Sequence, residues 1–250
     1  MISKNQIKFI RQLEQKKYRR REGLFVAEGT KVVGDLLARY QPHSIFATEE
    51  WINSPSCIPL LSKEGPGVVP VSPDELHRIS FQQHPQQVLA LFPLPSVPAI
   101  TPEGLMIGLD GVQDPGNLGT IIRIADWFGI NTIICSEDTV DAWNPKVVQA
   151  TMGSIARVNI VYTNLPDFLG QLPTDFPVYG TFLDGKNIYR EELSDHGLII
   201  MGNEGNGISD AVRQRVNRRL LIPDFHQGPT ADSLNVAIAT AITCSEFRRR

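Results

Sequence analysis

The sequence predicts an α/β protein built from two domains. Its 250 residues are 42% hydrophobic and 20% charged, a composition that can bury one large core or two smaller ones. Short apolar runs typical of strands alternate with segments of helical periodicity along most of the chain. Prolines at positions 93, 95, 98 and 102 interrupt this alternation. Because proline continues neither a helix nor a central strand, we expect residues 93–102 to form a stiff linker between the domains.

Residues 1–92 are predicted to form a small α/β domain. Within the first 21 residues, Ile7, Ile10 and Leu13 recur at helical spacing, which indicates a helix with an apolar stripe and a basic face. After this helix the pattern predicts strands at 24–27, 44–47, 68–71 and 87–92 and helices at 30–39 and 73–80.

Residues 103–250 show a stronger alternation. The pattern predicts strands at 105–109, 131–135, 157–161, 178–182, 198–201 and 219–222 and helices at 117–128, 145–152 and 233–249. This order indicates a mostly parallel, doubly wound sheet. The last helix is apolar on nearly all sides over its first turns, so we expect it to pack between the sheet and a second subunit of a homodimer.

Basic residues are concentrated at the N-terminus. The formal net charge is −3, but the first 21 residues carry eight basic residues and one acid, a net charge of +7, which leaves −10 for the remainder. The overall charge argues against a protein that coats nucleic acid nonspecifically. The cluster is typical either of a solvated helix face or of an arm that contacts phosphates. The candidate residues for such an arm are Lys16, Lys17, Arg19, Arg20 and Arg21.

Several classes of protein are disfavoured. The sequence contains no run of about 18 to 20 apolar residues and no signal peptide. We therefore expect a cytoplasmic protein that has no membrane partner. Cys57, Cys135 and Cys244 are far apart and odd in number, which favours neither a disulfide framework nor a metal site.

Polar residues and glycines gather in three loops that follow predicted strands. Ligands of open α/β sheets bind at the carboxyl ends of strands, so these loops are the expected site. The first loop, residues 110–123, contains a turn at Asp114, a candidate helix cap at Asn117, and Arg123 within an apolar helical run. A guanidinium is costly in such a run unless an anion meets it, which makes Arg123 a candidate functional residue.

The other two loops narrow the class of ligand and supply further candidate residues. Residues 201–209 have the spacing G-x-x-G-x-G, which differs from the dinucleotide fingerprint, and no phosphate-loop motif occurs in the chain. Residues 222–235 lead into the last helix, where Ser233 is a candidate N-cap. Asn235, placed one turn further on, would gain nothing from capping and is the better functional candidate.

In this order the loops resemble the three motifs of the SpoU or TrmH-type branch of the SPOUT methyltransferases, which methylate ribose 2′-hydroxyls in tRNA and rRNA. The resemblance rests on residues 114–123, 202–207 and 233–237, and residues 16–29 resemble the L30e-like substrate-binding domain that precedes the catalytic domain in many members. Two departures occur. Many members have histidine where this chain has Gly116, and the loop from Pro223 to Ser233 is longer than usual, which blurs residue assignments between 224 and 232.

The resemblance implies a SPOUT fold with a deep trefoil knot, which physical priors alone would not choose. It also implies a homodimer whose knotted regions face each other, S-adenosylmethionine as methyl donor, an RNA substrate (rRNA or tRNA) and no metal. The implied cofactor-binding residues are Gly202, Ile222, Leu234, Thr181 and Leu183. The implied catalytic residues are Arg123, Asn117, Glu204, Ser233 and Asn235.

The role of Arg123 stays open between two possibilities. The family proposal makes it the base that removes the ribose proton, but an arginine has a pKa above about 12 and resists deprotonation. The second possibility is a fixed cation that pairs with a substrate phosphate and stabilises the developing alkoxide.

Two alternative functions also remain. One is a noncatalytic RNA-binding protein of the same fold, and the other is a SPOUT enzyme that methylates a base. Calorimetric binding of S-adenosylmethionine discriminates against the first, and nuclease-resistant 2′-O-methyl dinucleotides discriminate against the second.

Overall fold

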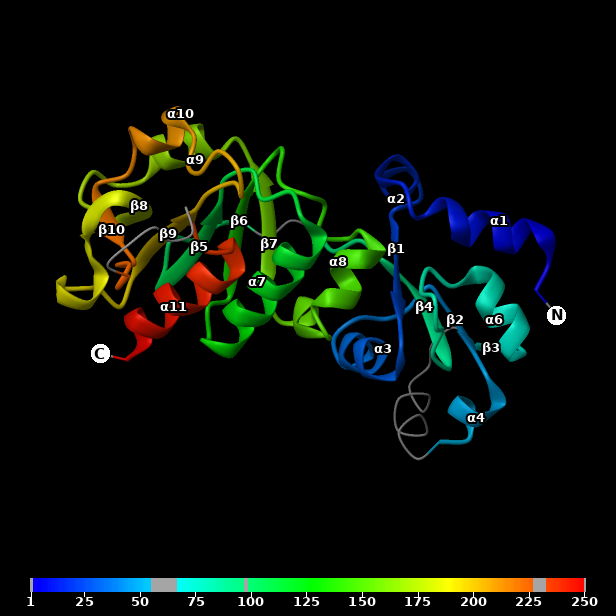
Figure 1. The fold of residues 1–250 in the computed structure, drawn as a ribbon. Coiled ribbons are helices and arrows are strands. Elements are labelled where there is room, and N and C mark those ends of the chain that lie inside the picture. Colours follow the sequence, from blue (N-terminus) through cyan, green and yellow to red (C-terminus); the bar gives the residue numbers. More distant parts are fainter. Residues whose placement is uncertain (1, 55–66, 97–98, 227–232, 250) are drawn as a thin grey trace. The chain divides into compact units, whose positions relative to one another are not determined.

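The protein is described by a computed structural model that covers residues 2–54, 67–96, 99–226 and 233–249. The chain divides into two compact units (Figure 1), one formed by Met1–Ser96 with Asp141–Ala156 and the other by Val97–Val140 with Arg157–Arg250. In this division residues 141–156 group with the first unit, whereas residues 103–250 were predicted to form one domain. Over the described ranges, no helix is both long and apolar enough to cross a membrane.

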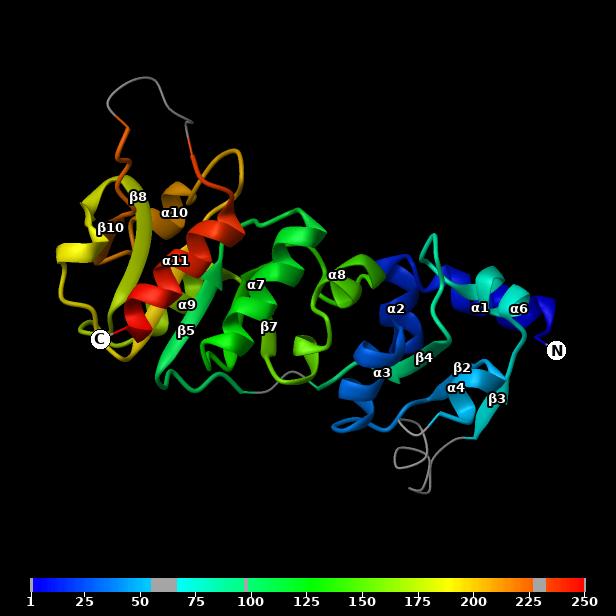
Figure 2. The same cartoon turned by 60° about the horizontal axis from the view of Figure 1, so that its bottom comes forward.

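The first unit contains a four-stranded sheet in the order β1 (Leu24–Glu28), β4 (Val88–Pro93), β2 (Ser44–Ala47) and β3 (Val68–Pro70). Strand β4 is antiparallel to both its neighbours, whereas β2 and β3 are parallel. Its helices are α1 (Lys4–Gln12), α2 (Lys16–Glu22), α3 (Thr30–Leu37), α4 (Glu49–Ile52), α6 (Pro73–Ile79) and α8 (Pro145–Ala150), with a 3-10 turn η1 (Ser154–Ala156). Figure 2 shows α1 beside α6.

The N-terminal segment forms two helices instead of the one expected. Ser3 and Gln6 make a reciprocal capping box at the start of α1, and Gly23, with φ of 65°, ends α2. The predicted apolar stripe is confirmed, because Ile10 and Leu13 are 1% and 0% exposed within the core of this unit. Removing the segment would therefore remove part of that core.

Arg19 is buried, which corrects its assignment as an RNA-binding residue. Only 2% of it is exposed, and its guanidinium forms an ion pair with Asp141. Nη1 also donates to the carbonyl oxygens of Leu13 at 2.8 Å and Glu14 at 2.7 Å. Because its donors are engaged inside the first unit, Arg19 stabilises the turn between α1 and α2 and does not face a phosphate.

The second unit contains a six-stranded parallel sheet in the order β10 (Arg218–Leu221), β8 (Val178–Asn187), β9 (Gly197–Met201), β5 (Leu105–Leu109), β6 (Thr132–Ser136) and β7 (Asn159–Thr163). Every neighbouring pair is parallel, which confirms the predicted sheet. All residues of the central strands β5 and β9 are buried. Their residues Leu109 and Met201 are paired, so the loops that follow them start side by side.

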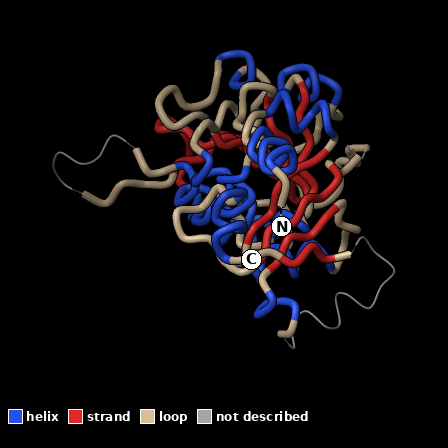
Figure 3. Tube along the Cα trace, turned by 90° about the vertical axis from the view of Figure 1, so that its right-hand side faces the viewer, coloured by secondary structure: helices blue, strands red, loops and turns tan. Residues whose placement is uncertain are grey.

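The helices of the second unit are α7 (Pro115–Trp127), α9 (Leu165–Gln171), α10 (Asp210–Arg213) and α11 (Val236–Arg248), with a 3-10 turn η2 (Ile188–Arg190). Figures 1 and 2 show α7 and α11 side by side on one face of the sheet. Leu165, Leu169 and Val212 pack with β5, β8 and β9 side chains in a separate cluster, which places α9 and α10 on the other face. Figure 3 shows the trace by helix, strand and loop.

Helix α11 begins at Val236, later than expected, with Asn235 as its N-cap. Its apolar character is also interrupted. The hydroxyls of Thr240 and Thr243 are satisfied by carbonyl oxygens of the preceding turn, at 2.7 and 2.8 Å, and both residues are buried. On the opposite side, Ile238 is 53% exposed. Within the described chain the helix therefore buries one face and leaves another open.

Candidate active site

The three polar loops meet at the carboxyl edge of the parallel sheet. The first loop connects β5 to α7, the second connects β9 to α10, and the third enters α11. Asp110, directly after β5, accepts a hydrogen bond at 2.7 Å from the backbone N–H of Ser209. Asn203 donates to the carbonyl oxygen of Gly111 at 2.7 Å. These two contacts fix the second loop against the first.

A chain of hydrogen bonds joins one side chain from each loop. Asn117 Nδ2 donates to Glu204 Oε1 at 2.9 Å, and Asn235 Nδ2 donates to Asn117 Oδ1 at 2.9 Å. Three of the five predicted catalytic residues are thus brought together. In this arrangement each asparagine uses one of its two amide hydrogens, which leaves the second for another acceptor.

Two details of helix capping differ from expectation. Asp114, and not Asn117, is the N-cap of α7, and its carboxylate accepts from the Asn117 backbone N–H at 2.8 Å. Asn235 does cap α11, since its Oδ1 accepts from the N–H groups of Ala237 at 3.0 Å and Ile238 at 3.3 Å. The amide nitrogen of Asn235 also donates to Asn117. The Asn235 side chain therefore both caps α11 and takes part in the chain of hydrogen bonds at the site.

Glu204 is held as a carboxylate. It accepts from the backbone N–H groups of Gln113 and Asp114, both at 3.3 Å, in addition to Asn117. Burial alone would raise the pKa of the Glu204 carboxyl, but hydrogen bonds from Asn117 and from backbone N–H groups outweigh burial and lower its pKa below the ordinary value. At neutral pH this carboxylate is therefore ionised and orients Asn117.

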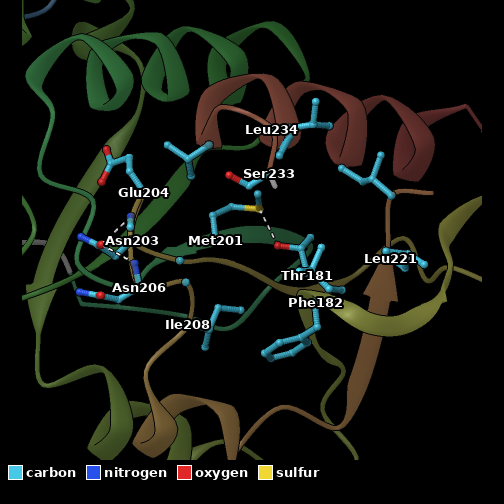
Figure 4. Close-up of a pocket in the computed structure, with 17 residues that line it drawn as sticks. Thr181, Phe182, Met201, Asn203, Glu204, Asn206, Ile208, Leu221, Ser233 and Leu234 are labelled. Atoms are coloured by element: carbon cyan, nitrogen blue, oxygen red, sulfur yellow. Dashed lines mark hydrogen bonds between the residues drawn. The ribbon is translucent and has the colours of Figure 1, made fainter. Parts of the chain in front are cut away.

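A cavity of about 420 Å³ opens beside this chain of hydrogen bonds (Figure 4). All five predicted cofactor-binding residues line this cavity: Thr181, Leu183, Gly202, Ile222 and Leu234. Glu204 and Ser233, which were predicted to be catalytic, also line it. Figure 4 shows Asn203, Glu204 and Asn206 on one side and Thr181, Phe182 and Leu221 on another. The cavity thus has a polar end and a largely apolar end.

Gly202 is required where the second loop approaches itself. A Cβ atom at this position would overlap the backbone of Gly207 and Ile208. The same loop is closed by a backbone bridge between Asn203 and Gly207, with hydrogen bonds of 2.9 and 3.0 Å. The glycine therefore lets this edge of the cavity consist of backbone atoms.

Arg123 and Ser233 lie outside the chain of hydrogen bonds. Arg123 is exposed on α7, and no hydrogen bond or ion pair joins it to another residue that the structure describes. The guanidinium of Arg123 therefore carries no burial cost, contrary to the expectation from its apolar neighbours, because its side chain lies on the solvent face of the helix. Ser233 is exposed at the cavity, and residues 227–232 of the predicted long loop lie outside the described residues.

Sequence reasoning missed Asn203 and Asp110 as organising residues. Asn203 Oδ1 accepts from the N–H groups of Gly205 at 2.9 Å and Asn206 at 3.0 Å, so it shapes the second loop from within. Asp110 is only 8% exposed. Its position directly after the predicted buried strand 105–109 was the signal in the sequence that could have identified Asp110. Across the described ranges, no cluster of three or more metal-ligating side chains was found.

Comparison with known proteins identifies the chain. Residues 104–245 match the SpoU rRNA Methylase family, which is more than half of the sequence. The chain belongs to the SpoU rRNA methylase family. Residues 4–90 match the MRM3-like substrate binding domain. The predicted family and the predicted substrate-binding domain are therefore confirmed.

Relatives of this SpoU family member match it over nearly its whole length. The 23S rRNA (guanosine(2553)-2'-O)-methyltransferase RlmP of Bacillus subtilis is 32% identical over 249 residues, which are 98% of this chain and 97% of the relative. A TrmH-family structure from Porphyromonas gingivalis has 43% identity and a TM-score of 0.90, with 100% and 99% of the chains covered. An AdoMet-bound rRNA methyltransferase from Sinorhizobium meliloti has 32% identity and a TM-score of 0.87, with 100% and 96% covered. The predicted SPOUT-type α/β fold is confirmed.

Proposed function

We propose that this chain transfers the methyl group of S-adenosylmethionine to a ribose 2′-hydroxyl of ribosomal RNA. The observation that carries the proposal is the Glu204–Asn117–Asn235 chain of hydrogen bonds beside a cavity lined by the second and third loops. The activity agrees with the name of the Bacillus subtilis relative, and the methyl donor agrees with the AdoMet-bound Sinorhizobium meliloti structure.

The cavity residues fit this methyl donor. Backbone atoms are available next to Gly202, where no Cβ fits, and the apolar end suits an adenine ring. When bound, S-adenosylmethionine supplies an electrophilic methyl group on a sulfonium. The polar end, where Glu204 lies, is then the end at which ribose must be held for an in-line attack.

The residues of the chain prepare the ribose. The ionised Glu204 fixes the amide orientation of Asn117, and Asn117 in turn accepts from Asn235. The remaining N–H of each amide is free to donate to ribose oxygens in one defined direction, which positions the 2′-hydroxyl. Arg123, exposed on the helix that carries Asn117, supplies a positive charge for a substrate phosphate or for the developing alkoxide.

Methylation in vitro tests the proposal. Purified chain is incubated with methyl-labelled S-adenosylmethionine and ribosomal RNA, and the product is digested to nucleosides and to alkali-resistant dinucleotides. We expect label in a 2′-O-methyl nucleoside and in a dinucleotide that resists alkaline cleavage. Label in a base would instead support the base-methylating alternative. If the chain binds RNA but does not bind S-adenosylmethionine, the result would support the noncatalytic alternative.

We further propose that the exposed basic face of α2 contacts RNA phosphates. Lys17, Arg20 and Arg21 are exposed, and the cationic groups of Lys17 and Arg21 lie 4.7 and 4.8 Å from the centre of the Tyr18 ring. Lys16 is half buried. Two cations beside an aromatic ring, with the exposed Arg20 between them and Glu22 paired to Arg21, form a mainly basic face that suits a nucleic-acid backbone.

Changing Lys17, Arg20 and Arg21 to glutamine is expected to weaken rRNA binding and to reduce the salt dependence of its logarithmic affinity by about 0.7 to 0.9 per lost contact. Arg19→Gln is the matched contrast, because Arg19 is buried and paired with Asp141. It should lower the melting temperature and leave the salt slope unchanged. Filter binding between about 50 and 200 mM salt measures the slope, and equal slopes for the triple variant and the wild type would contradict the contact.

We also propose a cytoplasmic homodimer whose C-terminal segment forms a trefoil knot. Large apolar side chains are exposed on or next to the adjacent helices α7 and α11, with Trp127, Leu234 and Ile238 at 85%, 51% and 53%. Leu234 and Ile238 lie at the start of α11 and Trp127 lies at the far end of α7, and exposed apolar side chains along a helix pair are typical of an interface. Light scattering at micromolar concentration should give a dimer that Ile238→Asp dissociates, and an active wild-type monomer would refute the homodimer. An experimental trace of the backbone through residues 222–236 tests the proposed knot. Cell fractionation tests the proposed cytoplasmic location.

A further inference from the structure

Strand β8 leaves its ladder with β10 for five residues. Gly180 pairs with Arg219, but the next residue of β10, Leu220, pairs with Lys186. Residues 181–185 therefore loop out of the pairing, and Thr181, Phe182 and Leu183 from this excursion line the cavity. We call residues 181–185 the β8 excursion. Because residues 181–185 have no paired residue in β10, contacts other than regular strand pairing contribute to their conformation.

One carboxylate ties the β8 excursion to two neighbouring elements. Asp184 accepts from Nη2 of Arg213, at the end of α10, with distances of 3.3 and 3.2 Å to its two oxygens. It also accepts from Nη2 of Arg219 in β10. The two guanidinium groups are thereby held near each other by the charge between them.

The same two arginines hold the aromatic ring of the β8 excursion. The guanidinium carbons of Arg213 and Arg219 lie 4.7 and 4.5 Å from the centre of the Phe182 ring. Cations at this distance from a ring are attracted to its π face. Without Asp184, two like charges would converge on one ring with no anion to offset their repulsion. Asp184 therefore contributes to the position of the Phe182 ring, which also packs against the apolar cluster that includes Leu198 and Val212.

The apolar end of the cavity, where Phe182 lies, suits the adenosine part of the methyl donor. Phe182 and Leu221 supply apolar surface there, whereas Asn203, Glu204 and Asn206 lie on the other side. The reacting methyl group must lie near Glu204 and its partner Asn117, because those residues position the ribose in the proposed reaction. Adenosine then extends toward Phe182.

We propose that Asp184 is a positioning residue for methyl-donor binding, which acts through Arg213 and Arg219 to hold Phe182 as a wall of the adenosine subsite. This inference rests on the proposed function of the cavity. Asp184, Arg213 and Arg219 have side chains that are 60%, 42% and 40% exposed, so their ion pairs contribute little to global stability. Their effect is on the preorganisation of the cavity wall, which lowers the cost of ordering it when ligand binds.

Calorimetry with S-adenosylmethionine and with 5′-methylthioadenosine, which retains the adenosine part, tests the assignment. Asp184→Ala should weaken both ligands about three- to tenfold and raise KM for S-adenosylmethionine, with kcat and the melting temperature nearly unchanged. Asp195→Ala is the matched control, because Asp195 is a carboxylate of the same unit with a 97% exposed side chain. It removes the same charge and should leave both affinities unaltered.

A double variant separates positioning from a general charge effect. If Asp184 acts through Arg213, then Asp184→Ala combined with Arg213→Gln should weaken binding by less than the product of the two single effects. Wild-type affinity in Asp184→Ala, or equal losses in Asp184→Ala and Asp195→Ala, would overturn the inference while leaving the proposed function intact. Failure of the wild type to bind S-adenosylmethionine would instead overturn the proposed function, and the inference with it.

Discussion

Arg123→Ala is expected to lower the rate of methyl transfer about 100-fold or more, the scale of losing one preorganised charge donor. The side chain is exposed on α7 and forms no hydrogen bond or ion pair with another described residue. Its removal should therefore leave the folded chain and the melting temperature intact. Arg123 is also absent from the lining of the cavity, so the affinity for S-adenosylmethionine should be unchanged. Single-turnover kinetics with saturating methyl donor measure the loss.

Arg123→Lys distinguishes the two possible roles of the guanidinium. A fixed cation is partly replaced by lysine, which keeps the charge but loses the planar fork, so measurable activity should remain. If Arg123 is instead the base, lysine can take over that role at high pH, because lysine reaches its neutral form more easily than arginine. The activity of Arg123→Lys should then rise with pH below about 10. A pH–rate profile of both variants separates these outcomes. Loss of S-adenosylmethionine binding in Arg123→Ala would show that the residue belongs to the cofactor site, and full activity would remove it from the mechanism.

Gly202→Ala is expected to weaken S-adenosylmethionine binding about 10- to 100-fold, because overpacking costs about 1–3 kcal/mol. The added methyl group would overlap the backbone of Gly207 and Ile208, so the second loop must shift where it lines the cavity. The overlap is with backbone, which cannot rotate away as a flexible side chain can. Calorimetry with S-adenosylmethionine measures the loss.

Gly205→Ala is the matched control in the same loop. A Cβ at Gly205 would meet only Asn203 Oδ1, at 3.6 Å, which is an ordinary contact distance. Its backbone N–H would still donate to Asn203. We expect Gly205→Ala to bind S-adenosylmethionine with an affinity close to that of the wild type. Equal affinities for the two alanine variants would show that the close approach at Gly202 does not shape the site.

Local pattern predicted most of the elements that carry the site. Strands β2 and β5 have the bounds expected from their apolar runs, and the parallel order of the second sheet follows from the alternation of strands and helices. The short helices α4, α9 and α10 were not predicted. Helices α4 and α10 have four residues each, which is too short for helical periodicity to be read. Helix α9 was missed although it has seven residues, as many as the predicted α6. The β8 excursion was also missed, although Asp184-Gly185 is a turn signal that indicates an interruption of the strand.

Arg19 shows the limit of reasoning from charge. It lies among five basic residues within a six-residue stretch, and the sequence does not distinguish it from Arg20 and Arg21. Only the position of Asp141, 122 residues later, makes it a buried partner instead of a surface cation. The membership of residues 141–156 in the first unit has the same origin, because it depends on contacts between segments far apart in the chain.

The sequence by itself determined which residue types gather in the three loops, because strand periodicity and glycine content are local properties of the chain. Tertiary structure decided which of those side chains meet. Asn117 is separated by 87 residues from Glu204 and by 118 from Asn235. Their hydrogen bonds exist because parallel pairing places the ends of β5 and β9 together and because α11 returns beside α7. A hydrogen bond requires donor and acceptor within about 3 Å, and such proximity between distant residues is set by strand register and helix packing, not by local propensity.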